Sequence, residues 1–195
     1  MKKKFAVMAI AGAALCMAAM PACAAEDLIT VGYAQVGHES DWRTANTQNY
    51  QDVFSEEAGY SLDLVDCDND NAAQLEAVRT FINKEMDYII IAPIQSAGWD
   101  TVLQEAQDAG IPVIIADREI EADASLYDAW VGTNTKNEGI TAGNWLAEYL
   151  GDKDANILVI EGSVGASATI GRTDGFNEVA KDHENWKILD SQSGD

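Results

Sequence analysis

Short apolar runs alternate with amphipathic segments of helical period along nearly the whole sequence after residue 26. The runs at 88–92 and 112–116 are apolar throughout, as in strands that are buried on both faces of a sheet. Such strands, separated by helices, predict right-handed βαβ units and an α/β fold with parallel sheets flanked by helices. We expect strands at 28–35, 61–66, 87–92, 112–116, 127–133, 156–161 and 186–189, and helices at 42–58, 71–84, 98–109, 137–150 and 170–182.

The expected elements divide into two groups along the chain. Five strands precede residue 135, which is enough for a complete sheet, whereas only two follow it, and two strands do not form a stable sheet layer alone. We therefore expect two lobes with a crossing near residues 132–135 and an incomplete second lobe. The expected division is a signal peptide at 1–24, an N-terminal lobe at 25–133 and a partial C-terminal lobe at 134–195.

The first 24 residues have the pattern of an export signal. Three lysines at positions 2–4 precede an apolar run at 5–20, and small residues precede a cleavage site after Ala24. The run of about 16 residues is shorter than the roughly 20 that a transmembrane helix needs. We expect export to the periplasm or cell envelope. A lipid anchor at Cys23 stays open as an alternative, since Met20 stands where a lipoprotein signal usually has leucine.

The charge balance is strongly acidic, with 33 Asp and Glu against 12 Lys and Arg, for a formal charge of -21. Binding to phosphate backbones needs clustered Lys and Arg that this sequence does not have, so the expected partners include no nucleic acid. The chain also lacks a basic amphipathic stretch of the kind that binds an anionic membrane surface.

Enzymatic motifs are absent from the sequence. It has neither a dinucleotide fingerprint nor a phosphate-binding P-loop. Asp66, Asp68 and Asp70 alternate as in a metal loop, but the glycine and the bidentate Glu that a calcium loop requires are missing. Cys67, the thiol that would stay after signal cleavage, has no local signature of a nucleophile with a base. We expect binding without turnover, with no cofactor and no metal.

Charged and aromatic side chains follow two of the expected strands, at the sheet edge where parallel α/β proteins bind ligands. An indole can cover the apolar face of a sugar, carboxylates accept hydrogen bonds from its hydroxyls, and guanidinium groups donate to its oxygens. This set of side chains suits a neutral polyol. The residues are Glu39, Ser40, Asp41, Trp42 and Arg43 after the first strand and Asp117 and Arg118 after the fourth.

Four segments in this order carry a resemblance to a known family: VGYAQVGHESDWR, DYIIIAPIQSAGWD, AGIPVIIADREI and VIEGSVGASATIGRTDGF. Together they resemble the periplasmic sugar-binding proteins of ABC importers, of the ribose and galactose type, and within them the galactofuranose-binding branch. The resemblance runs from about Ile29 to Asp195. It implies two α/β lobes that close on one monosaccharide and deliver it to the membrane permease of an ABC transporter.

The resemblance also implies site residues. It assigns ligand contacts to the loop at 39–43 and to the Asp117-Arg118 pair, and it adds Arg172 and Ser163 from the second lobe. Asp41 and Gly171 depart from the residues that the family pattern leads us to expect, Gly and Asp. One alternative is a sugar-sensing protein that serves a receptor or regulator. Another is a DNA-binding repressor with similar lobes, which the missing basic helix-turn-helix disfavours.

Three arginines could also indicate an anionic ligand, such as a sugar acid. The same loops supply three carboxylates, so the expected site is close to neutral. We therefore expect a neutral hexose or pentose, with galactofuranose preferred, while the sequence leaves the ring form and anomer open. The residues that set this balance are Arg43, Arg118 and Arg172 against Glu39, Asp41 and Asp117.

Overall fold

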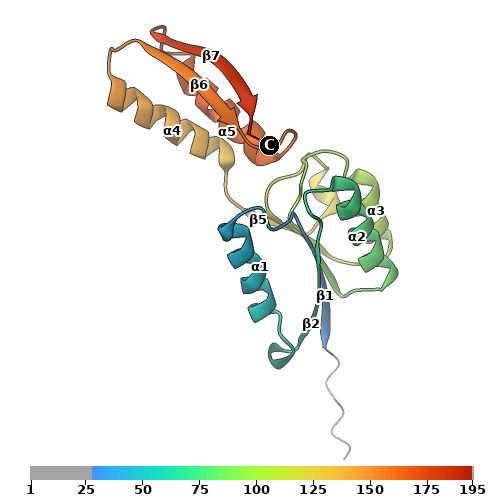
Figure 1. The fold of residues 1–195 in the computed structure, drawn as a ribbon. Coiled ribbons are helices and arrows are strands. Elements are labelled where there is room, and N and C mark those ends of the chain that lie inside the picture. Colours follow the sequence, from blue (N-terminus) through green and yellow to red (C-terminus); the bar gives the residue numbers. More distant parts are fainter. Residues whose placement is uncertain (1–27, 195) are drawn as a thin grey trace, which may run out of the picture.

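A computed structural model describes residues 28–194 of the chain. They form two α/β lobes joined by a short segment between Gly132 and Thr135 (Figure 1). The expected signal peptide at 1–24, the candidate anchor Cys23 and the final residue Asp195 lie outside the described residues. Within the described part of the chain, no helix is long and apolar enough to cross a membrane.

The first lobe contains a five-stranded sheet in which every neighbouring pair of strands is parallel. The spatial order is β2-β1-β3-β4-β5, so the direction of winding reverses between β1 and β3. In open parallel sheets, the crevice at the carboxyl ends of such a reversal is where ligands bind. The strands are β1 (Ile29–Gln35), β2 (Tyr60–Asp66), β3 (Tyr88–Ile91), β4 (Val113–Asp117) and β5 (Ala129–Gly132).

Helices cover both faces of this sheet. Helix α1 (Asp41–Val53) lies on one face, and α2 (Asn71–Asn83) and α3 (Asp100–Asp108) lie on the other (Figure 1). Side chains of β1 alternate between these faces. Tyr33 stacks on Tyr50 of α1 with ring centres 4.1 Å apart, while Gly32 faces the ring of Phe81 on α2 so closely that a Cβ atom would overlap it.

The core of the first lobe lies mainly between the sheet and helices α2 and α3. The apolar runs of β3 and β4 form much of this core, because both strands lie inside the sheet with a neighbouring strand on each side and helices packed on the sheet faces. Burying each of these large side chains contributes roughly 1.5–3 kcal/mol. The largest fully buried apolar members are Trp99, Tyr33, Phe81, Ile89, Ile91, Leu103 and Ile115.

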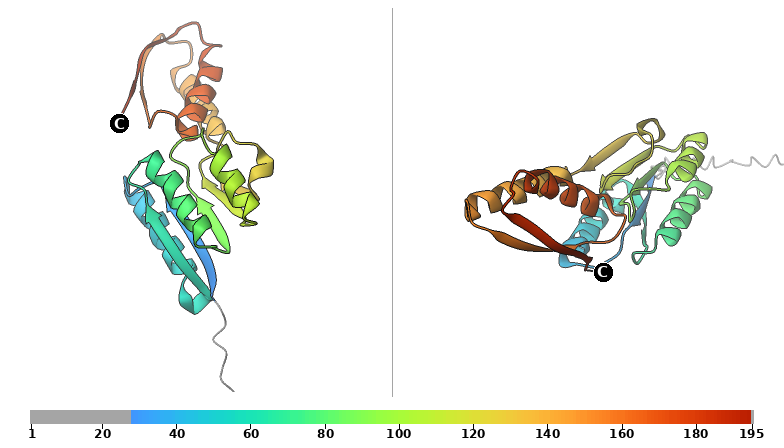
Figure 2. Two further views of the ribbon diagram at one scale, coloured as in Figure 1. Left: turned by 90° about the vertical axis from the view of Figure 1, so that its right-hand side faces the viewer. Right: turned by 90° about the horizontal axis from the view of Figure 1, so that it is seen from above.

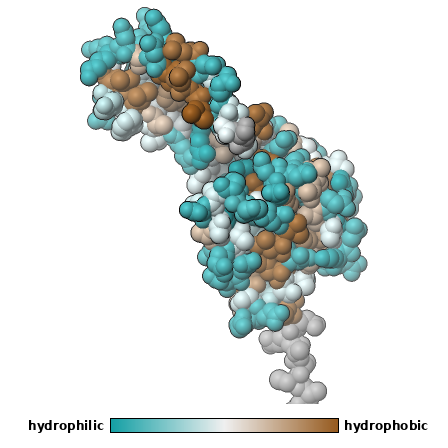
Figure 3. Space-filling view, in the orientation of Figure 1, coloured by the Kyte–Doolittle hydropathy of each residue, from teal (hydrophilic) through white to brown (hydrophobic). Residues whose placement is uncertain are grey.

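The second lobe contains two parallel strands and two helices (Figure 2). An open cavity of about 620 Å³, lined largely by apolar side chains, lies between the helices and strands. Apolar side chains also gather on the surface of this lobe, at the top of Figure 3; Leu158 is 71% exposed and Ile160 is 83% exposed. The elements are α4 (Thr135–Leu150), β6 (Ala155–Glu161), α5 (Ser167–Ala180) and β7 (Trp186–Ser193).

Glycines allow α4 and α5 to pack with their backbones in close approach. A Cβ atom at Gly139 would overlap the carbonyl oxygen of Arg172, and one at Gly175 would overlap that of Lys136. At Gly171, where the resemblance leads us to expect Asp, a Cβ atom would instead overlap the side-chain hydroxyl of Thr135 and lie close to the backbone nitrogen of Lys136. Glycine therefore has a structural reason at this position, since a larger residue would have to displace the start of α4.

Replacing Gly175 with alanine is expected to lower the free energy of unfolding of the second lobe by about 1–3 kcal/mol, the usual cost of overpacking. The obstructing atoms belong to the backbone of α4 and cannot turn away, so this cost exceeds the roughly 1 kcal/mol of helix propensity that alanine gains. Chemical denaturation measures the change. The exposed neighbour Asp174 provides the control, and equal stability of Gly175→Ala and Asp174→Ala would contradict the tight crossing.

The α/β fold with parallel sheets flanked by helices is confirmed, with differences at some element boundaries. The helix expected over 42–58 ends at Val53 and is followed by a short 3-10 turn, η1 (Glu56–Ala58). Phe54 interrupts it, since its ring packs edge-on against Tyr60. Helix α5 begins three residues earlier than expected, and β7 extends to Ser193. A second 3-10 turn, η2 (Ala124–Leu126), precedes β5.

Candidate functional site

The loop between β1 and α1 is shaped by the start of the helix. Ser40 is the N-cap residue, and its hydroxyl oxygen accepts a hydrogen bond of 3.1 Å from the backbone N–H of Arg43. Asp41 lies in the first turn, where a negative charge is favourable beside the helix dipole. These local preferences start α1 directly after the carboxyl end of β1 and so fix Arg43 in its first turn.

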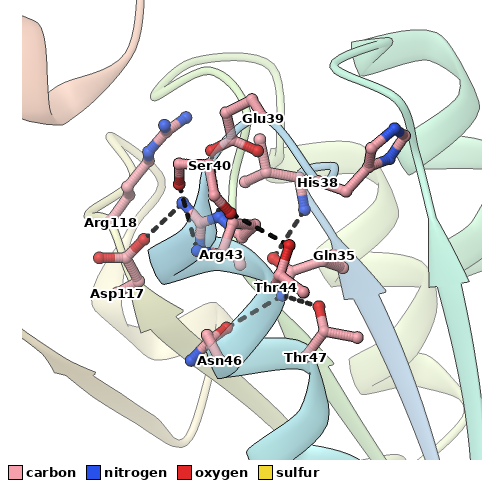
Figure 4. Close-up of polar contacts among 12 residues, drawn as sticks. Gln35, His38, Glu39, Ser40, Arg43, Thr44, Asn46, Thr47, Asp117 and Arg118 are labelled. Carbon is pink, nitrogen blue, oxygen red and sulfur yellow. Dashed lines mark hydrogen bonds and ion pairs between the residues drawn. The ribbon is translucent and has the colours of Figure 1, made fainter.

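Arg43 is the central side chain of the site and is only 4% exposed. Its Nη2 lies 3.0 Å from Oδ2 of Asp117, and its Nε lies 3.2 Å from Oε1 of Glu39 (Figure 4). Its guanidinium carbon is 4.9 Å from the ring centre of Trp42. The remaining nitrogen, Nη1, is buried and has no hydrogen-bond partner among residues 28–194. A buried donor without a partner is costly, so this atom indicates where a ligand oxygen would bind.

Asp117 ends strand β4 in an unusual backbone conformation, with a φ angle of +65°. Asp is one of the few residue types that adopt this left-handed region without a large penalty. Gly132 of β5 lies directly opposite, and a Cβ atom there would overlap the carbonyl oxygen of Asp117. The close approach of β5 and the left-handed turn together direct the Asp117 carboxylate toward Arg43.

Arg118 follows Asp117 and is held more loosely. Its Nη1 lies 3.5 Å from the carbonyl oxygen of Pro93 and 3.4 Å from that of Ile94, both in the loop after β3. Burial lowers the pKa of Arg118, and the positive charges of Arg43 and, more weakly, Arg172 lower it further. The guanidinium remains charged at neutral pH, with donors free for another group.

The second lobe presents Arg172 on α5, paired with Glu138 on α4. Arg172 Nε donates a hydrogen bond of 2.8 Å to Oε2 of Glu138, and this bond holds the pKa of Glu138 below its usual value. The loop after β6 also reaches the first lobe, because the carbonyl oxygen of Gly165 accepts a hydrogen bond of 2.9 Å from the backbone N–H of Ser96. The two lobes therefore meet beside the chain crossing.

The structure brings most of the expected site residues together at the carboxyl ends of β1 and β4. Glu39, Arg43 and Asp117 form one ion-pair network, with Arg118 beside it. Ser40 and Asp41 lie in the same loop, where the Ser40 hydroxyl is used as a helix cap. Trp42 is 58% exposed with its ring against Arg43. Ser163 lies in the loop that carries Gly165. Within residues 28–194 its side chain makes no hydrogen bond to another of the expected site residues.

Sequence reasoning missed two polar residues that support the site. Glu138 pairs with Arg172, but it lies in a helix that the sequence predicts only as a packing element. Gln35 is fully buried at the end of β1; its Nε2 donates a hydrogen bond of 2.9 Å to Oδ1 of Asn46 and so holds α1 against the sheet. A glutamine at the last position of an otherwise apolar strand is the signal that could have identified it.

Together these residues give a site with both donors and acceptors and no excess of positive charge. Three guanidinium groups stand against four carboxylates in the same region, since Glu138 joins the three that the sequence predicts. Among residues 28–194 no cluster of side chains is suited to hold a metal ion. The fold and the site define a class of two-lobed α/β protein in which charged and polar side chains gather at the strand ends beside the chain crossing. The charged groups are Arg43, Arg118, Arg172, Glu39, Asp41, Asp117 and Glu138.

Comparison with known proteins agrees with this class. The chain belongs to the family of the periplasmic binding protein domain, whose model matches residues 31–195. It is similar to the galactofuranose-binding protein YtfQ of Escherichia coli K12, with 42% identity over 179 residues that cover 91% of this chain and 56% of that protein. Relatives that it matches are named as binding proteins for galactofuranose, fructose and ribose.

Two solved structures show the same arrangement. A galactofuranose-binding protein matches with 43% identity and a TM-score of 0.81, over 86% of this chain and 56% of that one. A protein from Mycobacterium smegmatis in complex with β-D-fucofuranose matches with 41% identity and a TM-score of 0.80, over the same shares of the two chains. The chain spans about half the length of the relatives that it matches.

Proposed function

We propose that the protein captures a monosaccharide between its two lobes and delivers it to the permease of an ABC importer, from the periplasm or cell envelope. The observation that carries the proposal is the buried Nη1 of Arg43, which has no partner among the described residues although the other two nitrogens of the group are paired. A sugar hydroxyl at this position would satisfy the donor. The geometry of the neighbouring Asp117 carboxylate supports a second hydrogen bond to the same ring.

The ligand that we propose is a neutral sugar, with galactofuranose or a related furanose preferred. The presence of four carboxylates beside three guanidinium groups argues against a sugar acid, because an anionic ligand is best stabilised by excess positive charge. The relatives support the furanose, since a galactofuranose-binding protein and a protein solved in complex with β-D-fucofuranose are both more than 40% identical to this chain.

Each expected residue has a proposed role in this site. The Trp42 ring covers an apolar face of the sugar, since its indole is exposed at the rim and held by contact with Arg43. Carboxylates accept from sugar hydroxyls and guanidinium groups donate to sugar oxygens. Ser40 and Asp41 shape the loop, and Ser163 contributes from the second lobe. The accepting and donating groups are Glu39, Asp117, Arg43, Arg118 and Arg172.

A panel of sugars tests the proposal on the full-length protein as the cell makes it. Thermal unfolding is followed with galactose, ribose, arabinose, glucose and galacturonate, and with a methyl galactofuranoside that cannot open to the pyranose form. A specific ligand at 100 times its dissociation constant should stabilise the fold by about 2.7 kcal/mol. We expect the furanoside to give the largest shift. A response to galacturonate alone would overturn the neutral-sugar assignment, and no response to any sugar would overturn the proposed function.

A further inference from the structure

Gln74 is a fully buried polar residue on α2 whose hydrogen bonds all end on the main chain at the edge of the site. Its Nε2 donates to the carbonyl oxygens of Ala34 at 3.2 Å and Ala92 at 2.6 Å, at the ends of β1 and β3. Its Oε1 accepts a hydrogen bond of 2.9 Å from the backbone N–H of Ile94. One side chain thus connects two strand ends with the loop that follows β3.

The three bonds satisfy backbone groups that have no access to water. Ala92 already donates its own N–H to the carbonyl oxygen of Ala34 at 3.1 Å, so the two strand ends stay paired without Gln74. The N–H of Ile94 has no such second bond among the described contacts. The contacts that depend on Gln74 alone are therefore those with the carbonyl oxygen of Ala92 and the N–H of Ile94, and the two together fix the loop that follows β3.

This loop is also the surface against which Arg118 rests. The same residue, Ile94, gives its N–H to Gln74 and its carbonyl oxygen to Arg118, at 2.9 Å and 3.4 Å. The contacts of Arg118 with Pro93 and Ile94 are long, near the limit for a hydrogen bond, so a shift of the loop by a few tenths of an ångström breaks them. The direction of the Arg118 guanidinium follows the position of this loop.

We infer that Gln74 is a positioning residue for the sugar site, which holds Arg118 in its binding orientation through the main chain at Ile94. The inference rests on the proposed function, because Arg118 is taken there as a ligand contact. Gln74 itself does not touch the sugar. Its effect on affinity passes through Arg118 and disappears when the Arg118 guanidinium is removed.

A double-mutant cycle on the full-length protein tests the inference, with the affinity for the sugar identified by the panel as the readout. Gln74→Met keeps the volume and removes all three bonds, and Arg118→Ala removes the guanidinium. Charged hydrogen bonds of this kind are worth about tenfold or more in affinity. We expect Gln74→Met to weaken binding about tenfold in the parent and less than about twofold in the Arg118→Ala background.

Val78→Ala is the matched control, because Val78 is fully buried one turn further along α2 and its apolar side chain makes no hydrogen bond to the loop after β3. It lowers stability but should leave affinity unchanged. Equal weakening by Gln74→Met in both backgrounds, or none in the parent, would overturn the inference while leaving the proposed function intact. Unchanged affinity of Arg118→Ala alone would remove Arg118 from the site and overturn the inference with it.

If Gln74→Met does not fold, Gln74→Glu carries the same test. A protonated glutamic acid has the shape of glutamine and can accept from Ile94 while its O–H donates to Ala92. Burial raises the pKa of such a carboxyl, so it is neutral at acidic pH and becomes charged as the pH rises. We expect sugar affinity near the parent value at low pH and a loss on raising the pH that the Arg118→Ala background does not show. A loss of the same size in both backgrounds would overturn the inference.

Discussion

Replacing Asp117 with alanine is expected to weaken sugar binding by about a hundredfold or more in the full-length protein. Hydrogen bonds to a charged group are worth roughly 1.5–3 kcal/mol each, and in the proposed site the Asp117 carboxylate accepts two from the sugar. The substitution also leaves Nη2 of Arg43 without the carboxylate that lies 3.0 Å from it. Titration calorimetry measures the loss.

The same substitution should lower stability without unfolding the chain. Arg43 is 4% exposed, and removing one partner of a buried ion pair costs up to about 3–5 kcal/mol. Asp117 is 30% exposed and Glu39 still pairs with Arg43, so the cost should fall at the lower end of that range. Alanine at a φ of +65° adds about 1 kcal/mol of backbone strain.

Asp117→Asn separates the two effects, because asparagine tolerates the left-handed conformation and keeps one acceptor oxygen. We expect most of the stability to return, with sugar affinity still at least about tenfold below that of the parent, since the charge is absent. If Asp117→Ala bound sugar as tightly as the parent protein, with its fold shown intact by circular dichroism, the assignment of Asp117 to the site would be wrong.

Much of the first lobe could be predicted from the sequence, because its signals are local. The run at 113–116 is apolar and bounded by Pro112 and Asp117, and parallel β strands buried on both faces produce that pattern. Ser40 before Asp41 is a typical helix start. The convergence of the loops at 39–43 and 117–118 follows from one rule, that parallel strands bring their carboxyl ends to the same edge of a sheet.

The parts that the sequence did not predict depend on contacts between distant residues. Gln74 lies in an amphipathic helix as one more polar position, and only the packing of α2 against β1 and β3 shows that it is buried. The role of Arg43 could be predicted only in part. Its position after the first strand predicts a ligand contact, but not that two of its three guanidinium nitrogens pair with protein carboxylates. The close packing of α4 and α5 at Gly139 and Gly175 depends on the backbone of the neighbouring helix, and the local sequence of one helix does not predict where the other lies.

The second lobe of the 195-residue chain, taken as it stands, is expected to open far more readily than the first. Its two strands leave Leu158 71% exposed, Ile160 83% exposed and Leu189 59% exposed, whereas the core strands β3 and β4 are almost entirely buried. A two-stranded sheet is marginally stable, and regions with few buried apolar contacts open at low free energy. Exposed apolar surface of this kind also promotes association between chains.

Limited proteolysis with thermolysin measures the difference between the lobes. We expect cleavage after residue 135 at least about a hundredfold faster than within 28–132, which corresponds to about 2.8 kcal/mol less free energy of opening. Ile160→Lys is the matched control, because it replaces an exposed apolar side chain and should reduce association measured by ultracentrifugation without slowing cleavage. A monomer whose protected fragment extends to residue 194 would contradict the prediction, because it would show that the two strands and two helices of the second lobe form a stable layer by themselves.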